Sequence, residues 1–80
     1  MKELAVLVKD RPGELARVTG ILAGAQINIK SIASETKKSG ESILRIVPAD
    51  NAEKAARALT SGGYKVHINH LLVITLIDRQ

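Results

Sequence analysis

The chain has 80 residues and no cysteine, which limits it to one domain and excludes disulfides, thiolate metal sites and cysteine nucleophiles. Its single aromatic residue, Tyr64, leaves the core to Ile, Leu, Val and Ala, and so small a core gains stability from dimerisation. The net charge of +4 is mildly basic. The start of the chain lacks a signal-peptide pattern and no apolar run approaches ~20 residues, so we expect a soluble, cytoplasmic protein with no membrane partner.

Residues 3–9 form the first predicted strand. Apolar side chains occupy both of its alternating sets of positions, which favours a central strand with both faces at least partly covered. Further along, apolar residues recur at helical spacing, and we expect a helix from Gly13 to about Ala25 that directs Glu14 and Arg17 outward.

The turn between these elements, Asp10-Arg11-Pro12-Gly13-Glu14-Leu15, has residues suited to a ligand-binding connection. Pro12 suits the first turn of a helix, Asp10 can accept hydrogen bonds from amides two or three residues on, and Gly13 allows close approach to the backbone. Such a turn ends at a helix N-terminus with free N–H groups, which favours binding of a small anion. The same residues also suit a plain strand-to-helix connection, so the turn alone does not establish a site.

Two glycines four residues apart, Gly20 and Gly24, weaken the predicted helix by roughly 1 kcal/mol each relative to alanine. Gly24 either lies at the fraying end of the helix, or the pair permits close approach of a neighbouring backbone, such as that of a second subunit. The sequence leaves both interpretations open.

A half-exposed strand is expected from residue 27 to residue 37, followed by a hairpin turn at residues 38–40. The chain then returns as a strand over residues 41–47, which Pro48 ends because proline cannot donate to a ladder. Asp50 is expected to cap the second helix, with Glu53 completing the capping pair. The inward stripe of this helix consists of Ala52, Ala55, Ala56 and Leu59.

Gly62-Gly63 ends the second helix, and residues 64–68 alternate as an edge strand with one wet face does. Asn69-His70 interrupts this alternation, and an appended strand is predicted at residues 71–78. The order is therefore βαββαβ with one extra C-terminal strand. It defines an α+β fold of the ferredoxin-like type, a sandwich in which two helices cover one face of an antiparallel sheet.

Most functions that this fold supports lack their residues in this sequence. RNA-binding versions stack bases on strand aromatics and metal chaperones use paired cysteines, and neither feature is present. His67 and His70 point to opposite faces of a strand, and no serine and histidine form a nucleophile–base arrangement. We therefore expect no enzyme activity, no metal, no cofactor and no nucleic-acid partner.

Gly13 and Asn28 lie at opposite ends of the first predicted helix, ~20 Å apart within one chain. They can meet only across a dimer in which the helix of one subunit runs antiparallel to that of its mate. A ligand bound by both would hold such a dimer together.

The turn Asp10-Arg11-Pro12-Gly13-Glu14-Leu15-Ala16, followed by Ile21-Leu22-Ala23 and Ile27-Asn28-Ile29, resembles the ACT domain, a small regulatory module of amino-acid metabolism. The resemblance covers residues 3–68 and implies the βαββαβ fold, association in pairs and binding of a small amino acid at a homodimer interface. The ligand-binding residues that it implies are Asp10, Arg11, Gly13 and Leu15 from one subunit, with Asn28 and the Ile29 backbone from its partner.

By this resemblance, residues 1–80 form a single ACT-like domain with its core at residues 3–68. Residues 72–79 match residues 4–11 in character, and they resemble the start of a second copy, as in tandem ACT proteins. The module is expected to act as a stand-alone allosteric regulator, or on a separate metabolic enzyme.

Gln26 departs from the family pattern, because glycine commonly precedes the Ile-Asn-Ile stretch. It is expected to shift the end of the helix and to crowd the pocket. The alternative function is a ligand-free assembly module that acts through the sheet edge and the C-terminal strand. In this alternative the appended strand pairs beside residues 64–68 after a tight turn at Asn69-His70, or crosses into a partner's sheet.

Overall fold

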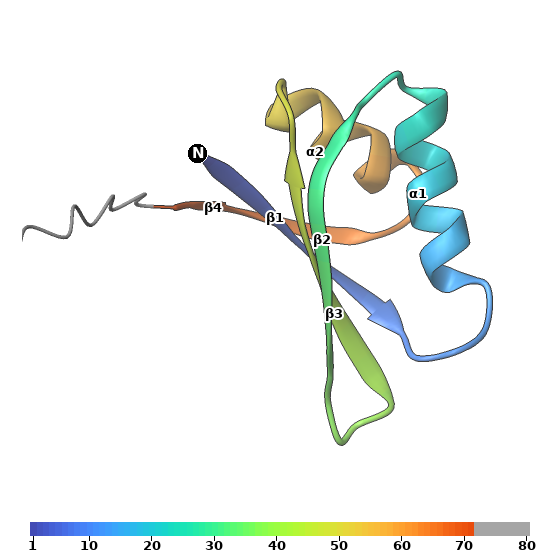
Figure 1. Ribbon diagram of the computed structural model, residues 1–80. Helices are drawn as coiled ribbons and strands as arrows, with labels where there is room; N and C mark the ends of the chain where they lie inside the picture. The colour runs from blue at the N-terminus through green and yellow to red at the C-terminus, as the bar shows by residue number, and fades with distance from the viewer. Residues whose placement is uncertain (72–80) are drawn as a thin grey trace, which may run out of the picture.

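A computed structural model describes residues 1–71, and these residues fold in the predicted βαββαβ order (Figure 1). The appended strand expected at residues 71–78 lies outside the described residues, except for Leu71. The elements are β1 (Lys2–Lys9), α1 (Glu14–Gly24), β2 (Ile29–Thr36), β3 (Glu41–Pro48), α2 (Ala52–Ser61) and β4 (Lys65–His70).

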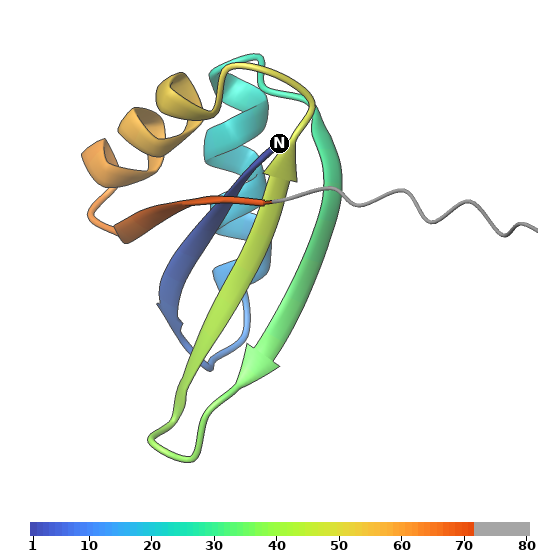
Figure 2. The same cartoon turned by 90° about the vertical axis from the view of Figure 1, so that its left-hand side faces the viewer.

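The four strands form one antiparallel sheet in the order β2-β3-β1-β4. The central position of β1 and the edge position of β4 are both as predicted. In the register, Leu4 of β1 lies between Ile46 of β3 and Ile68 of β4. Both helices cover the same face of the sheet and leave the other face open, as Figure 2 shows.

The core lies between the helices and the covered face of the sheet. Every second residue of β1 points into it, because side chains of a strand alternate between faces, and Leu4 and Val6 are fully buried there. Complete burial of one such aliphatic side chain stabilises the fold by about 1.5–3 kcal/mol. The other core residues are Val8, Val18, Leu22, Ile27, Leu44, Ile46, Ala52, Ala55, Leu59 and Tyr64.

The open face carries a row of polar side chains across all four strands. Arg45 of β3 donates to Glu3 of β1 at 3.2 Å and to Glu35 of β2 at 3.3 Å. Asn69 of β4 also donates to Glu3, at 3.5 Å. Because each of these bonds joins different strands, the row ties the strands together on the side that no helix covers.

The two residues predicted to interrupt the last strand instead continue it. Asn69 pairs with Glu3 and His70 with Lys2, and the Leu71 amide donates to the Met1 carbonyl at 2.7 Å. The predicted tight turn at Asn69-His70 is therefore wrong. An edge strand tolerates polar residues on its wet face, so the loss of apolar alternation there did not mark an end.

The cap of α2 is also shifted by one residue from the prediction. Asn51, and not Asp50, is the N-cap, and its side-chain oxygen accepts a hydrogen bond from the Lys54 amide at 3.3 Å. Asn51 has a φ of +50°, and asparagine tolerates this left-handed conformation better than most residues.

Between α1 and β2, Gln26 has a φ of +60°, in the left-handed region where glycine is unstrained. The next amide, that of Ile27, donates to the Leu22 carbonyl at 2.9 Å and closes the end of the helix. Ile27 is buried, and β2 begins at Ile29, two residues later than predicted, with a bulge between Ile29 and Ser31. The need for a left-handed residue here gives a physical reason for glycine at this place in related sequences.

Candidate ligand-binding site

Backbone hydrogen bonds hold the first half of the turn from β1 to α1. The Asp10 amide donates to the Gly40 carbonyl in the β2–β3 hairpin at 2.9 Å, and the Arg11 amide donates to Lys9 at 3.0 Å. Within residues 1–71 no amide donates to the Asp10 carboxylate, so the predicted role of that side chain in fixing the turn is wrong. The α-helix begins at Glu14, so Pro12 lies in the turn before it and not in its first turn as predicted.

Gly13 is the N-cap of α1 and has a φ of +87°, which glycine adopts without strain. The Gly13 carbonyl accepts a backbone hydrogen bond from the Arg17 amide, one turn further along the helix, at 2.9 Å. In the described part of the chain the amides of Leu15 and Ala16 have no acceptor. These two donors, at the positive end of the helix dipole, are available to an anionic group.

A hollow of about 90 Å³ lies beside this turn, between the start of α1 and strands β2 and β3. We call it the effector hollow. It is far smaller than the roughly 300–1,000 Å³ of typical small-molecule sites, so the hollow does not by itself enclose such a ligand. Its lining consists of Val8, Lys9, Asp10, Arg11, Glu14, Leu15, Ser34, Ser42 and Leu44.

The structure brings together four of the six predicted site residues. Asp10, Arg11 and Leu15 line the effector hollow, and Gly13 lies in the same turn. Asn28 and Ile29 lie at the other end of α1, where the Asn28 carbonyl accepts from Ala49 at 2.8 Å. One chain thus separates the two sets, as the helix length predicted.

Two serines in this hollow were missed from the sequence. Ser42 is buried and pairs with Val8 at the end of β1, and Ser34 lies on β2 opposite Leu44. The predicted hairpin turn carried the signal for Ser34 alone, because it fixes the β2–β3 register that places Ser34 opposite Leu44. The pairing of Ser42 with Val8 belongs to the β1–β3 register, which no local turn sets.

Glu14 and Arg17 do not both point outward as predicted, because Glu14 is buried against Tyr64. The Tyr64 hydroxyl donates to Glu14 Oε2 at 2.8 Å, and Arg11 Nε donates to Glu14 Oε1 at 3.3 Å. Arg17 reaches across from α1, donating to the Tyr64 hydroxyl at 3.2 Å and to the Gly62 carbonyl at 3.1 Å. Its guanidinium lies over the Tyr64 ring, 5.1 Å from the centroid. These four side chains tie the start of α1 to the segment between α2 and β4.

The electrostatics of this cluster favour a charged Glu14 and a neutral Tyr64. The hydrogen bond from Tyr64 lowers the pKa of Glu14 below its ordinary value, and Arg11 and Arg17 lower that pKa further, against the opposing effect of burial. Burial raises the pKa of Tyr64, and its bond to Glu14 raises it further.

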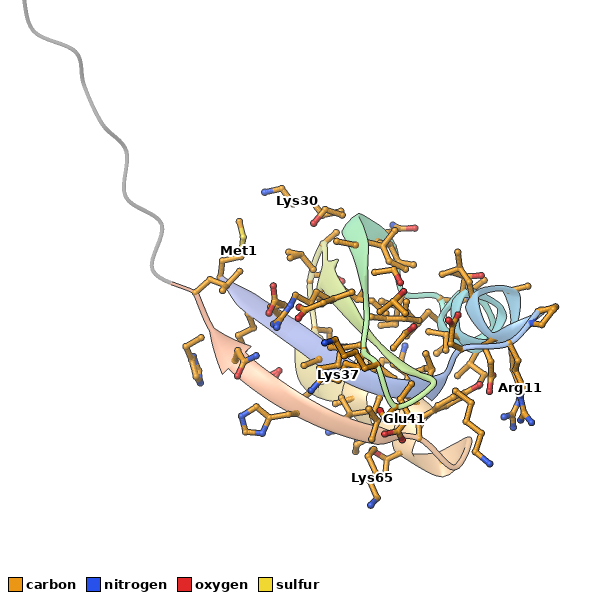
Figure 3. All side chains as sticks on the ribbon, turned by 90° about the horizontal axis from the view of Figure 1, so that it is seen from below. Met1, Arg11, Lys30, Lys37, Glu41 and Lys65 are labelled. Atoms are coloured by element: carbon orange, nitrogen blue, oxygen red, sulfur yellow. The ribbon has the colours of Figure 1, made fainter. Side chains whose placement is uncertain are left out.

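A second hollow of about 270 Å³ lies on the β4 side of the same turn. We call it the basic hollow, because four cationic residues line it against two carboxylates. Arg11 extends from the turn that follows β1, on the side of the molecule opposite Met1 (Figure 3). Lys65 lies on β4, at the edge of the sheet (Figure 3). Its lining consists of Leu7, Val8, Lys9, Arg11, Glu14, Arg17, Glu41, Gly63, Tyr64 and Lys65.

Along residues 1–71, no group of three or more His, Cys, Asp or Glu side chains could hold a metal ion. Neither helix of this part has the length and apolar character needed to cross a membrane.

The chain is a small two-layer α+β module, with two free helix amides and a small hollow at the turn from β1 to α1. The family model of the ACT domain matches residues 2–61, and the chain belongs to the ACT domain family, whose members are regulatory amino-acid-binding modules. No curated protein sequence matches the chain at a significant level.

Solved structures include one close in both length and sequence. It is the ACT domain of prephenate dehydrogenase from Bacillus anthracis, with 34% identity and a TM-score of 0.72 over 81% of this chain and 99% of that one. Protein BT0572 from Bacteroides thetaiotaomicron is 29% identical, with a TM-score of 0.75 over 85% of this chain and 46% of that one. The regulatory subunit of aspartate kinase from Thermus thermophilus shares the fold at 20% identity, with a TM-score of 0.75 over 86% of this chain and 50% of that one. The chain therefore spans about half the length of these last two proteins.

Proposed function

We propose that the chain is a regulatory ACT domain that binds a small amino acid between two copies of itself. The observation that carries this proposal is the incomplete site at the start of α1. Its donors are the Leu15 and Ala16 amides, and Leu15 lines a hollow of only about 90 Å³. A second wall is needed to enclose an amino acid. A second copy of the chain supplies one that carries an amide side chain and carbonyl groups able to accept from the ammonium.

The second wall is the far end of α1 from the other copy. Asn28 is exposed, and it lies one helix length from Gly13 in its own chain. When two α1 helices lie side by side and antiparallel, Asn28 of each copy faces the turn of the other. An effector's carboxylate then meets the α1 amides, and its ammonium meets the Asn28 side chain or a nearby carbonyl.

The surface around α1 and β2 suits this association. The β2 strand is an edge of the sheet, and its outer backbone groups are free to pair. Two of the exposed large apolar side chains are here, Leu15 with 51% and Ile32 with 40% of its surface accessible. Covering them with a second copy removes apolar area from water.

The expected affinity is modest. A helix N-terminus stabilises an anion by only about 0.3–1 kcal/mol when exposed and up to about 2 kcal/mol when partly buried. Several such contacts together correspond to a Kd between roughly 1 μM and 1 mM.

The test is a thermal-shift screen of the full chain against the twenty amino acids, followed by calorimetry and sedimentation of the best responder. We expect at least one amino acid to raise Tm and to shift the chain towards a dimer. No response to any amino acid at tens of millimolar would overturn the proposal.

The variant Asn28→Ala tests the second wall directly. It removes an exposed amide and leaves the backbone bond from Ala49 to residue 28 intact, so the fold is expected to survive. We expect at least a fivefold weaker Kd for the responding amino acid, since a lost hydrogen bond to a charged group costs about 1.5–3 kcal/mol. The control is Asn69→Ala, at the β4 edge, which is expected to leave Kd unchanged.

A further inference from the structure

Glu14 presents a problem for any carboxylate that binds at the start of α1. It is the first residue of that helix, next to the free amides of Leu15 and Ala16. Among the carboxylates that line the two hollows, Glu14 alone is common to both. A negative charge free to turn into the effector hollow would repel the ligand's carboxylate and compete for the same donors.

The cluster around Tyr64 directs this charge elsewhere. Glu14 Oε2 accepts from the Tyr64 hydroxyl at 2.8 Å, and Tyr64 lines the basic hollow but not the effector hollow. Both residues are 9% exposed, so the bond is largely shielded from water. Arg17 fixes the hydroxyl from the other side, at 3.2 Å, and adds a compensating positive charge.

We propose that Tyr64, held by Arg17, is a positioning residue for ligand binding: it keeps the Glu14 carboxylate on the β4 side of the turn, so that the start of α1 stays attractive to a carboxylate. This inference rests on the proposed function and names what makes that site selective for an anion. Tyr64 does not touch the ligand, and acts through Glu14.

The same hydrogen bonds also position the Arg11 guanidinium. Its Nε donates to Glu14 Oε1 at 3.3 Å, and within residues 1–71 its two Nη atoms donate to no protein group. Glu14 therefore holds the guanidinium beside the turn with its outer donors available. The chain of contacts runs from Tyr64 to Glu14 to Arg11, and Arg11 lines the effector hollow.

The first experiment needs no amino-acid ligand. NMR titration of the full chain follows the Glu14 carboxyl and the Leu15 and Ala16 amides, in the native protein and in Tyr64→Phe. In the variant we expect the Glu14 pKa to rise towards its ordinary value and the two amides to titrate with it, because the freed carboxylate turns towards them. An unchanged Glu14 pKa together with unchanged amide titration would overturn the inference.

The second experiment measures calorimetric Kd for the amino acid that gives the largest thermal shift. Tyr64→Phe is expected to bind it about tenfold more weakly, which corresponds to about 1.4 kcal/mol. Adding Glu14→Gln to that variant removes the charge and is expected to restore Kd to within about threefold of the native value. A purely structural role for Tyr64 predicts no such rescue, and a double variant as weak as the single one would contradict the proposal.

Glu14→Gln alone serves as the reference for the double variant, because glutamine has nearly the same shape and keeps one acceptor oxygen while removing the charge. Once the charge is absent, Tyr64→Phe is expected to change Kd by less than about threefold relative to Glu14→Gln alone. If no amino acid binds any variant, the proposed function fails, while the NMR titration still decides whether Tyr64 positions Glu14. The lone tyrosine absorbance also reports the Tyr64 pKa directly, since the chain has no other aromatic residue.

Discussion

Gln26 occupies a backbone conformation that a side chain makes costly. Its φ of +60° lies in the left-handed region, which costs a residue with a Cβ roughly 1–2 kcal/mol relative to the right-handed conformation. The chain turns there from α1 into the segment that leads to Asn28. The exposed Gln26 side chain does not line the effector hollow of its own chain, so within one copy it strains the turn and does not crowd the site.

Replacing Gln26 with glycine is therefore expected to stabilise the fold. The released strain, reduced by the greater entropy of glycine in the unfolded chain, gives a net gain of about 0.5–1 kcal/mol. The control Ala25→Gly, at a φ of −88°, has no strain to release and is expected to lose about 0.5–1 kcal/mol. Urea unfolding of both variants measures the difference, and a loss of stability in Gln26→Gly would contradict the assignment of strain.

Glu14 makes stability depend on pH on the acid side. Its pKa in the folded chain lies below the ordinary value of 4.5, so the unfolded chain binds the proton more readily. The stabilising contribution is complete above about pH 4.5 and is lost as the pH falls through the lowered pKa. Glu53 behaves in the same direction, because Lys2 donates to it.

In Glu14→Gln, the free energy of unfolding is expected to fall less steeply as the pH is lowered from about pH 5 to about pH 2, since the neutral side chain no longer titrates. We call this part of the curve of unfolding free energy against pH the acid limb. Urea midpoints measured across this range test it. Tyr64→Phe is expected to flatten the limb in the same direction but by less, because Arg11 and Arg17 still favour the charged form. A variant limb as steep as the native one would show that Glu14 does not bear this dependence.

At the scale of the element, α1 combines good packing on one side with weak helix formers on the other. Val18 and Leu22 are fully buried, whereas Gly20 and Gly24 are exposed, and a Cβ built at either glycine meets nothing within 4 Å. No neighbour within the described chain therefore requires glycine. Gly24 is the last residue of α1, which agrees with a place at the end of the helix. For Gly20, the interpretation left open by the sequence is that the exposed side of α1 approaches a second copy.

The variant Gly20→Ala separates the effect of this glycine on helix stability from its effect on dimerisation. In the monomer it is expected to add up to about 1 kcal/mol, from the higher helix propensity of alanine. In a dimer with closely packed α1 helices, the added methyl groups hold the helices apart and weaken association by at least tenfold. Unfolding at low protein concentration and sedimentation equilibrium measure the two effects. Unchanged dimerisation would show that α1 is not the contact.

The limits of sequence reading also appear at this scale. Periodicity placed all four strands and both helices, because burial on one face leaves a local pattern in strands and in helices alike. It misplaced the α2 cap by one residue, since Asp50 and Asn51 are both good caps and backbone geometry decides between them. It could not find the bond between Glu14 and Tyr64, which joins residues 50 positions apart and follows no local period. The Asp10–Leu15 turn was predicted from its residue types, and its role with Asn28 and Ile29 from family resemblance. Ser34 required the β2–β3 register and Ser42 the β1–β3 register.

At the scale of the whole molecule, the proposed dimer uses α1 and the β2 edge, on the side of the sheet opposite β4. Residues beyond β4 are therefore not needed for it. The alternative assembly function makes the opposite prediction, because it recruits the other subunit through the C-terminal strand.

Removing residues 72–80 distinguishes these two functions. The cut keeps His70, which pairs with Lys2, and the Leu71 amide bond to Met1, so the β4 ladder stays whole. We expect the shortened chain to keep the native dimer mass and the native Kd for its amino acid. Loss of the dimer, measured by sedimentation of a chain that remains folded, would favour the assembly module.

The bond between Leu71 and Met1 has a consequence for how this module combines with other proteins. It brings the beginning of β1 and the end of β4 to one corner of the sheet, at the end of β1 away from the Asp10–Leu15 turn. Met1 and Leu71 therefore both lie at the opposite end of β1 from the Asp10–Leu15 turn. A fold whose ends are neighbours can be inserted into a loop of another protein without altering its packing. The fold of residues 1–71 is suited to such insertion, with the Asp10–Leu15 turn remote from both junctions.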